Sequence, residues 1–330
     1  MRLRRSDPAR PGYTRRRRGR GVTFYDVERR PITDPDVLAR LRALAIPPAW
    51  QQVWICPDPR GHIQATGIDA AGRKQYLYHP VWRTKRDEAK FDHVLEVAAR
   101  LPTLRQRVRA DLTQRGLGRP RVLATVARLL DMGMFRVGSD QYAAGTDPTY
   151  GVSTLRPEHI RGERGCMVFA FTAKGGIEQV RRVGDAQVCE VLRQLRRRRA
   201  GADRIFGYWD AAARVWRDVH SDDVNEYLRA ASGGEMTAKD FRTWHGTVLA
   251  ATELAVAGWH RSPARRRRTV AAVMTSVSEL LGNTPTVARA SYVDPRVIDL
   301  YHEGVTITVD LDAPKEIAER AVLEVLTLRT

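Results

Sequence analysis

The sequence predicts an α+β protein with a small, mainly β N-terminal domain and a larger, mainly α-helical domain. A chain of 330 residues is about twice the usual domain size, so two domains are expected. Up to His79 the apolar residues mostly alternate as in strands, whereas after Trp82 they recur with a helical period. We therefore place a domain boundary near residue 85, between a β-rich domain over 21–85 and a helical domain over 86–330.

The first twenty residues form a basic tail of Arg, Gly and Pro. No apolar stretch follows the tail, so it is not a secretory signal. Because this composition buries little apolar surface, we expect residues 1–20 to be disordered when free and to lie along phosphates when bound.

The predicted β domain contains three strand-like segments and one helix. The strands are expected at 53–56, 62–66 and 75–79, with Pro/Gly/Asp turns at 57–61 and 69–72. The helix is expected over 34–44.

The predicted helical domain is interrupted by two hairpins. Its first helix follows from the apolar residues at i, i+3, i+4 and i+7 between Phe91 and Leu101. Further helices are expected over 104–116, 120–133, 185–199, 221–231, 237–257 and 267–281, and from Pro314 onward. The hairpins span 167–180 and 205–216, and the Ala-Lys-Gly-Gly turn of the first places Lys174 at its tip.

The charge of the chain points to a polyanionic partner. Lys and Arg number 56 against 38 Asp and Glu, which gives a net charge of +18. Nucleic acid is the first candidate for such a partner. The alternative is that genomic base composition raises the arginine content without any partner.

The cysteine content predicts neither a disulfide framework nor a zinc site. Cys56, Cys166 and Cys189 are an odd number and lie far apart, without metal-ligand spacing. No apolar run is long enough to span a membrane. We therefore expect a protein of the reducing cytoplasm.

Four residues have side chains suited to cutting a phosphodiester without a metal: Arg136, Lys174, Arg242 and Tyr292. That chemistry needs a nucleophile, cations for the phosphate oxygens and an acid for the leaving oxygen. Tyrosine can supply the nucleophile, the arginine fork suits phosphate, and a lysine whose pKa is lowered by other cations can serve as the acid. Singly, each residue is also compatible with an ordinary surface, turn or packing role, although an arginine within the apolar helix pattern around Arg242 needs an anionic partner.

Together these residues resemble the type IB DNA topoisomerases, specifically the small bacterial and poxvirus class. The shared motifs are Phe-Arg-Val-Gly around Arg136, Phe-Arg-Thr-Trp around Arg242, the hairpin lysine, and Ser-Tyr-Val-Asp-Pro-Arg around Tyr292, which is the most specific. In the N-terminal half, Ile46-Pro-Pro-Ala-Trp, Trp54-Ile-Cys-Pro-Asp and Gly72-Arg-Lys-Gln-Tyr-Leu-Tyr-His also stand as in bacterial members. The resemblance covers nearly the whole chain after the basic tail.

The resemblance implies the fold of tyrosine recombinases and type IB topoisomerases, here a two-domain clamp closing on double-stranded DNA. Tyr292 is then expected to form a 3′-phosphotyrosyl link, with Lys174 as general acid and Arg136, Arg242 and Asn283 on the phosphate. The expected activity is relaxation of positive and negative supercoils by a monomer associated with the nucleoid, without ATP, a required metal or another cofactor. DNA contacts are expected from Gln75, Tyr76, Tyr78, Tyr142 and Lys239.

Two departures from the family pattern limit what is carried over. Many members have a histidine nine residues before the tyrosine, where this chain has Asn283. An amide can donate a hydrogen bond to a phosphate oxygen but excludes histidine proton chemistry. The lysines of the poxvirus pattern after Arg136 are replaced by Ser139, Asp140 and Gln141, so no target-sequence preference is inferred.

Two other functions remain as alternatives. A tyrosine-recombinase-like strand transferase shares the catalytic logic, but recombinases usually have histidine at the position of Lys239 and open with a helical domain. A non-catalytic basic DNA-binding protein would need only the charge and the tail. Retention of all four charged or nucleophilic residues argues against the second alternative.

Overall fold

The computed structural model describes residues 1–18, 21–133, 135–144, 146–198, 201–308, 310 and 313–328. It divides into two compact units, Met1–Phe91 and Asp92–Thr330, and helix α2 (Pro80–Leu112) carries the chain from one to the other. The division falls later than residue 85 because the start of α2 packs within the first unit, where the Trp82 and His62 rings lie 4.9 Å apart.

The first unit is built on a five-stranded antiparallel sheet. The strand order is β2-β1-β3-β4-β5. The strands are β1 (Tyr13–Arg18), β2 (Gly21–Tyr25), β3 (Gln51–Ile55), β4 (Ile63–Ile68) and β5 (Lys74–Tyr78). Helix α1 (Pro35–Ala43) begins at Asp34, whose carboxylate accepts hydrogen bonds from two main-chain N–H groups of the first turn. The core of this unit consists of Phe24, Leu41, Ile46, Val53, Ile55 and Ala65.

The prediction that residues 1–20 are disordered is wrong for residues 1–18. Strand β1 pairs with β2 on one side and with β3 on the other, so it lies inside the sheet. Arg15 donates hydrogen bonds to the carbonyl groups of Ile46, Pro47 and Trp50. Composition alone misled the prediction, because a strand can gain its main-chain hydrogen bonds from neighbours without apolar side chains of its own. Residues 19 and 20 lie outside the described residues.

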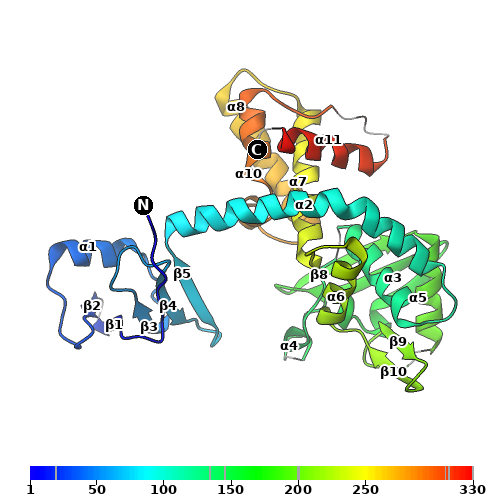
Figure 1. Ribbon diagram of the computed structural model, residues 1–330, viewed down its shortest axis with the longest axis horizontal. Helices are drawn as coiled ribbons and strands as arrows, with labels where there is room; N and C mark the ends of the chain where they lie inside the picture. The colour runs from blue at the N-terminus through cyan, green and yellow to red at the C-terminus, as the bar shows by residue number, and fades with distance from the viewer. Residues whose placement is uncertain are drawn as a thin grey trace. The chain divides into compact units, whose positions relative to one another are not determined.

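The second unit is mainly helical. After α2, the helices are α3 (Arg119–Asp131), α4 (Asp140–Ala143), α5 (Ala186–Arg198), α6 (Ser221–Ser232), α7 (Ala238–Ala257), α8 (Pro263–Leu281), α9 (Pro285–Ser291), α10 (Pro295–Glu303) and α11 (Lys315–Thr327). Helices α8, α10 and α11 lie together at one end of this unit, and α3, α5 and α6 at the other (Figure 1). Helix α7 contacts both groups, including α3, α6, α8, α10 and α11. It is therefore the central helix of the unit.

Helix α2 is longer than the sequence predicts. The two separate helices expected on either side of residue 102 form one helix of 33 residues with Pro102 inside it. The buried residues Val94, Leu101, Leu104 and Val108 keep the same helical phase across the proline. Continuous burial of this face offsets the main-chain hydrogen bond that proline cannot donate.

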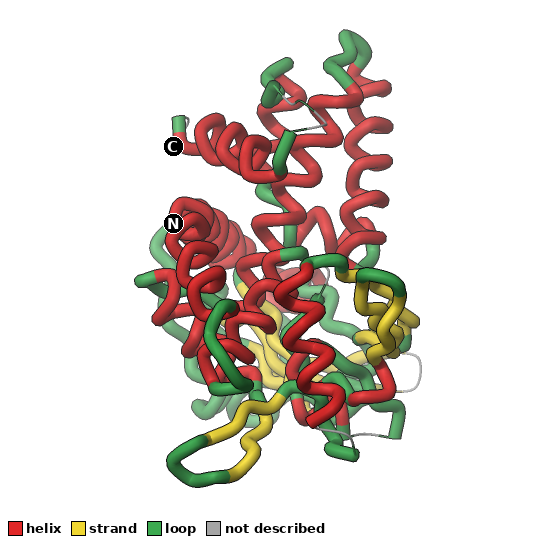
Figure 2. The backbone as a smooth tube through the Cα atoms, turned by 90° about the vertical axis from the view of Figure 1, so that its right-hand side faces the viewer, coloured by secondary structure: helices red, strands yellow, loops and turns green. Residues whose placement is uncertain are grey.

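The second unit contains more helix than strand (Figure 2). Strands β6 (Ile160–Glu163), β7 (Cys166–Ala173) and β8 (Ile177–Val183) form one antiparallel sheet, and β9 (Gly207–Asp210) pairs with β10 (Val215–Asp218). The two hairpins expected from the sequence are therefore present, and β6 extends the first one. The α+β fold class, with a β-rich N-terminal part and a larger helical part, is confirmed.

Helices α9 and α10 are short elements that the sequence analysis did not predict. Each begins with a side-chain cap, from Thr284 and Asp294, followed by a proline. Among the described residues, no helix is both long and apolar enough to cross a membrane.

Candidate active site

Tyr292 lies in the short link between α9 and α10, against the central helix α7. The hydroxyl of Thr247 on α7 donates to the Tyr292 carbonyl at 3.4 Å and accepts from the main-chain N–H of Asp294 at 3.0 Å. Gly246 permits this approach, because a Cβ at that position would lie 2.7 Å from the Tyr292 carbonyl oxygen. Helix α7 thus fixes the backbone of Tyr292 through contacts that no sequence motif marks.

Arg242 lies on the same helix, one turn before Gly246. Its side chain is almost fully buried, and its guanidinium carbon lies 5.0 Å from the centre of the Tyr292 ring. One terminal nitrogen donates to the carbonyl of Leu281 at 2.6 Å, while Nε is buried without a hydrogen-bond partner. Burial, together with the charge of nearby Arg136, lowers the pKa of Arg242 to about 10. A buried, charged side chain with an unsatisfied donor is an unusual arrangement that a bound anion would stabilise.

Arg136 approaches the same place from the segment after α3. One of its terminal nitrogens donates to the Gly282 carbonyl at 2.9 Å and to Asn283 Oδ1 at 2.8 Å. The amide nitrogen of Asn283 is buried and has no hydrogen-bond partner. The structure therefore brings Asn283, Arg136, Arg242 and Tyr292 together, as the sequence predicts, and leaves the amide donor of Asn283 free to bind an acceptor.

A third arginine, missed by the sequence analysis, joins this group. Arg181 on β8 donates to the Leu280 carbonyl at 3.2 Å, and its Nε is buried without a partner. Within the described ranges, no carboxylate pairs with Arg136, Arg181 or Arg242. All three bind main-chain carbonyls at the end of α8, where the helix dipole is negative. A signal was available, because alternation along β8 turns Ile177, Gln179 and Arg181 to one side.

The three arginines enclose only a small space. Arg136, Arg181 and Arg242 line a cavity of about 20 Å³, together with residues of β7, β8 and the end of α8. A cavity of this size holds about one water molecule. The space among the arginines is therefore too small for a phosphate group, although Arg136 is half-buried and bonded through only one terminal nitrogen.

The charge around Tyr292 acts on its phenol. Burial by itself raises the pKa of Tyr292, but the nearby charges of Arg242, Arg136 and Lys239 outweigh it and leave the pKa below its ordinary value. Lys239, which the sequence analysis expected to contact DNA, is exposed in the first turn of α7. The nucleophilic, ionised form of this tyrosine is thus favoured relative to a free tyrosine.

Lys174 is not bonded to this group of residues. It lies exposed at the tip of the β7–β8 hairpin, with Nζ 5.4 Å from the centre of the Tyr142 ring. Residues of the same hairpin close to the turn line the arginine cavity, namely Phe171, Ala173 and Ile177. The hairpin therefore flanks the site, while the lysine side chain points to Tyr142, another residue expected to contact DNA.

The remaining expected DNA contacts lie on β5 of the first unit, at the edge of its sheet. Tyr76 and Tyr78 stack with ring centres 6.1 Å apart, and the ammonium group of Lys74 lies 5.7 Å from the Tyr76 ring. Gln75, between them, donates its amide to Asp69 at 2.8 Å. Strand alternation places Gln75 on the opposite face from the two tyrosines, so the three residues do not form one surface.

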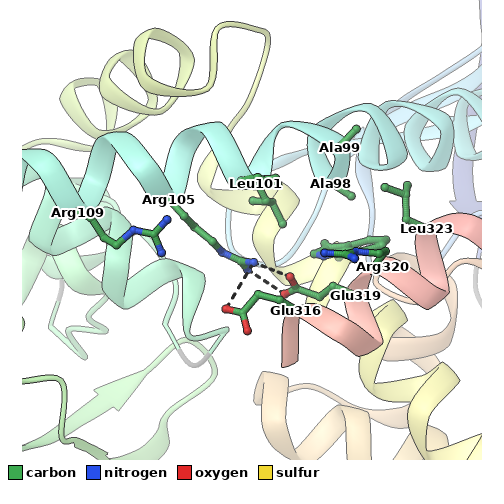
Figure 3. A pocket seen from close by; sticks show the side chains of 11 residues that line it. Ala98, Ala99, Leu101, Arg105, Arg109, Glu316, Glu319, Arg320 and Leu323 are labelled. Atoms are coloured by element: carbon green, nitrogen blue, oxygen red, sulfur yellow. Dashed lines mark hydrogen bonds and ion pairs between the residues drawn. The ribbon is translucent and has the colours of Figure 1, made fainter. Parts of the chain in front are cut away.

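A second buried cluster, in the same unit, is held together by Arg105 of α2. Its guanidinium group donates to both oxygens of Asp131 at 2.8 Å and to both oxygens of Glu319 on α11, as Figure 3 shows for Glu319. His245 of α7 lies 3.4 Å from Asp131. Asp131, His245 and Glu319 have the composition of a metal site, with ligand atoms within 4.8 Å of one another. The donor set does not fit a metal ion, because Arg105 already donates to all four carboxylate oxygens and the ammonium group of Lys315 lies 3.5 Å from Asp131.

The mixed α+β fold and the arginines without carboxylate partners are typical of proteins that act on nucleic acids. A family model described as the catalytic core of eukaryotic DNA topoisomerase I matches residues 79–305, and one described as the N-terminal domain of bacterial DNA topoisomerase IB matches residues 21–69. DNA topoisomerase 1B of Acanthamoeba polyphaga mimivirus is 28% identical over 290 residues, which cover 86% of this chain and 85% of the viral protein. The chain belongs to the type IB DNA topoisomerase family, and is thus an enzyme that acts on DNA.

Proposed function

We propose that the protein relaxes positively and negatively supercoiled DNA by cutting and rejoining one strand of the duplex. The observation that carries the proposal is the placement of Arg242 and Arg136, without any carboxylate partner, beside a tyrosine of lowered pKa. A phosphate would supply the missing anion. Its oxygens would also accept hydrogen bonds from Arg242 Nε and from the amide nitrogen of Asn283.

In the proposed reaction, the phenol of Tyr292 releases its proton to solvent, and the ionised Oη attacks a backbone phosphorus. A bond forms between phosphorus and the phenolic oxygen, the bond to the 5′ oxygen breaks, and the proton for that leaving oxygen comes from Lys174. Arg136, Arg242 and Asn283 stabilise the charge on the non-bridging oxygens. The products are a 3′-phosphotyrosyl link and a free 5′-hydroxyl, and religation is the reverse reaction.

Lys174 has to leave the Tyr142 ring to take this role. Its flexible stem of four carbon atoms allows the ammonium group to turn toward the DNA while the hairpin stays in place. We propose that Tyr142 and Lys239, like Tyr76, Tyr78 and Gln75, contact the DNA backbone or grooves. Gln75 would first have to exchange Asp69 for a base edge.

The proposed mechanism needs neither ATP nor a metal ion. The phosphotyrosyl link conserves the energy of the phosphodiester, and arginine side chains carry out the charge neutralisation. All proposed catalytic side chains come from one chain, which favours a monomer, and its duplex substrate implies association with the nucleoid. Sedimentation of the free protein and of its DNA complex would test the monomer.

The test of this function is relaxation of supercoiled plasmid in EDTA without ATP. We expect relaxation of both signs of supercoil, and trapping of a covalent protein–DNA adduct under denaturing conditions. Tyr292→Phe lacks only the attacking oxygen, so it should form no adduct while its noncovalent DNA affinity stays within a few-fold. An adduct with Tyr292→Phe, or a strict need for metal or ATP, would overturn the proposal.

A second test addresses the division of roles. A general acid is needed only for a poor leaving group, so replacing the bridging 5′ oxygen by sulfur should restore cleavage by Lys174→Ala. The same substrate should not restore cleavage by Arg242→Ala, because the charge on the phosphate remains. Equal recovery of both variants would contradict the assigned roles.

A further inference from the structure

Arg181 is a partly buried cation for which the proposed mechanism has no role. It comes from β8, the strand that follows the Lys174 turn, and not from the segments that carry Arg136 or Arg242. Within the described residues, its guanidinium group makes one hydrogen bond, from a terminal nitrogen to the Leu280 carbonyl, and burial lowers the pKa of Arg181. The charge of Arg181 also helps to lower the pKa of Arg242, so the two guanidinium groups are close.

A purely structural role does not explain this arrangement. A hydrogen bond to one carbonyl could be made by a neutral amide, without burying a charge or leaving Nε unsatisfied. Three like charges around one small cavity also repel one another. In contrast, Arg105 in the same unit is buried with two carboxylates.

We propose that Arg181 binds the DNA backbone as a third phosphate-contacting arginine, beside Arg136 and Arg242. This inference rests on the proposed function and deepens it. The Leu280, Leu281 and Gly282 carbonyls hold the three guanidinium groups in the DNA-free protein, and a backbone phosphate replaces these carbonyls when DNA binds. The cavity then opens toward the DNA as the side chains turn.

The neighbouring Arg182 provides a matched control. It lies on the same strand, is exposed, and pairs with Glu163 at 3.3 Å. Substituting Arg181→Gln or Arg182→Gln removes the same charge from adjacent positions. Only the first change removes a cation from the cavity.

The first measurement is single-turnover cleavage of a duplex at saturating protein. We expect Arg181→Gln to slow cleavage on the order of 10- to 100-fold, somewhat less than the loss of a donor from a fully formed oxyanion site. Arg181→Lys should recover part of the rate because it keeps the charge. Arg182→Gln should remain within about two-fold of the parent, as expected for an exposed ion pair. Equal rates for Arg181→Gln and Arg182→Gln would overturn the proposal.

The second measurement separates a phosphate contact from a structural effect. A methylphosphonate, which carries no charge, is placed in turn at the scissile phosphate and at each neighbouring phosphate. At the position that Arg181 contacts, the difference between Arg181→Gln and the parent should disappear. If the difference is the same on every substrate, Arg181 only supports the fold and the inference fails.

The third measurement does not depend on cleavage. In a Tyr292→Phe background, Arg181→Gln should reduce the slope of log affinity against log salt by about 0.9, the value for one phosphate contact. If the parent protein forms no covalent adduct, the proposed reaction is wrong. If Arg181→Gln still reduces the slope in that case, the Arg181 contact with a phosphate is nevertheless supported. An unchanged slope would show that Arg181 does not contact a phosphate. Thermal unfolding of Arg181→Lys and Arg181→Gln checks that both variants are folded.

Discussion

Two groups of buried arginines in the helical unit differ in what neutralises them. Arg105 donates to Asp131 and Glu319, so its charge is matched by carboxylates from α3 and α11. Arg242 is buried to a similar degree, yet among the described residues it has no carboxylate partner: it donates to the Leu281 carbonyl and interacts with the Tyr292 phenol. The pKa of Arg105 is raised because its carboxylate hydrogen bonds outweigh burial, whereas burial lowers the pKa of Arg242.

The difference separates stability from function. A buried cation with carboxylate partners is satisfied inside the protein, so its loss leaves unpaired carboxylates and weakens the fold. A buried cation without them is satisfied only by something from outside. Both groups touch α7, through His245 and Arg242, so one helix connects the cluster that stabilises the fold to the group proposed to bind the phosphate.

The largest effect on stability is expected at the Arg105 cluster. Arg105→Ala should lower the free energy of unfolding by about 3–5 kcal/mol, the cost of leaving buried carboxylates without their partner. Urea unfolding measures this change. Arg109→Ala, one turn later on α2 and exposed, should stay within about 0.5 kcal/mol of the parent. At temperatures where Arg105→Ala is folded, its single-turnover cleavage rate should stay near that of the parent.

The next prediction concerns Arg242, where we expect a large loss of activity without a loss of stability. Arg242→Gln should slow cleavage by about 10²–10³-fold, as for the loss of one preorganised donor. The free energy of unfolding should stay constant or rise, because the change removes an uncompensated charge. A stability loss as large as that of Arg105→Ala would mean that the two groups do not differ in the way described.

The sequence predicted the residues of the site better than their surroundings. The motifs around Arg136, Arg242 and Tyr292 identify residues that the structure brings together, although their catalytic roles remain predictions. The carbonyl groups that hold the arginines belong to the main chain at the end of α8, and no sequence motif marks them. Arg181 was missed because its position depends on which face of β8 turns to the cavity.

The fold class and the hairpins were likewise predictable, but three features were not. Helices α9 and α10, which lie on either side of Tyr292 in the sequence, are too short to show a clear apolar period. Pro102 suggested a break that packing of the buried face of α2 overrides. Strand β1 is basic, and its place in the sheet depends on pairing with residues distant in sequence.

A smaller effect is expected for Asn283. Its buried amide nitrogen is proposed to donate one neutral hydrogen bond, worth roughly 1–3 kcal/mol in the transition state. Asn283→Ala should therefore slow cleavage by about one to two orders of magnitude, while Asn283→His keeps substantial activity as another donor. If the alanine variant is as fast as the parent, the residue only anchors Arg136.

The pKa of Tyr292 predicts a pH dependence that Lys239 tunes. Since nearby cations lower this pKa, the ionised phenol becomes populated at lower pH than in a free tyrosine. Lys239→Gln removes one of these charges, so the pKa of Tyr292 should increase. The pH at which the cleavage rate begins to increase should then be higher than in the parent. Single-turnover rates across the pH range measure the shift. A variant that is slower by the same factor at every pH would show that Lys239 acts on DNA binding alone.

The smallest effect concerns two arginines of β1 in the first unit. As in the helical unit, the two arginines differ in what they bind inside the protein. Arg15 donates to three main-chain carbonyls, whereas Arg17 is exposed and its side chain makes no hydrogen bond or ion pair within the described part of the chain. Because β1 is a strand of the sheet, deleting the tail would damage the fold, and single substitutions are the proper test. Arg17→Gln should reduce the slope of log DNA affinity against log salt by about 0.9 and leave cleavage at saturating protein unchanged.

The matched change Arg15→Gln should act on the fold instead. It removes hydrogen bonds that join β1 to the segment before β3, so it should lower the stability of the first unit while the salt slope stays the same. Thermal unfolding and DNA binding over a range of salt concentrations measure the two effects. If Arg17→Gln leaves the slope unchanged, this arginine does not touch DNA, and genomic base composition becomes the better explanation for its presence.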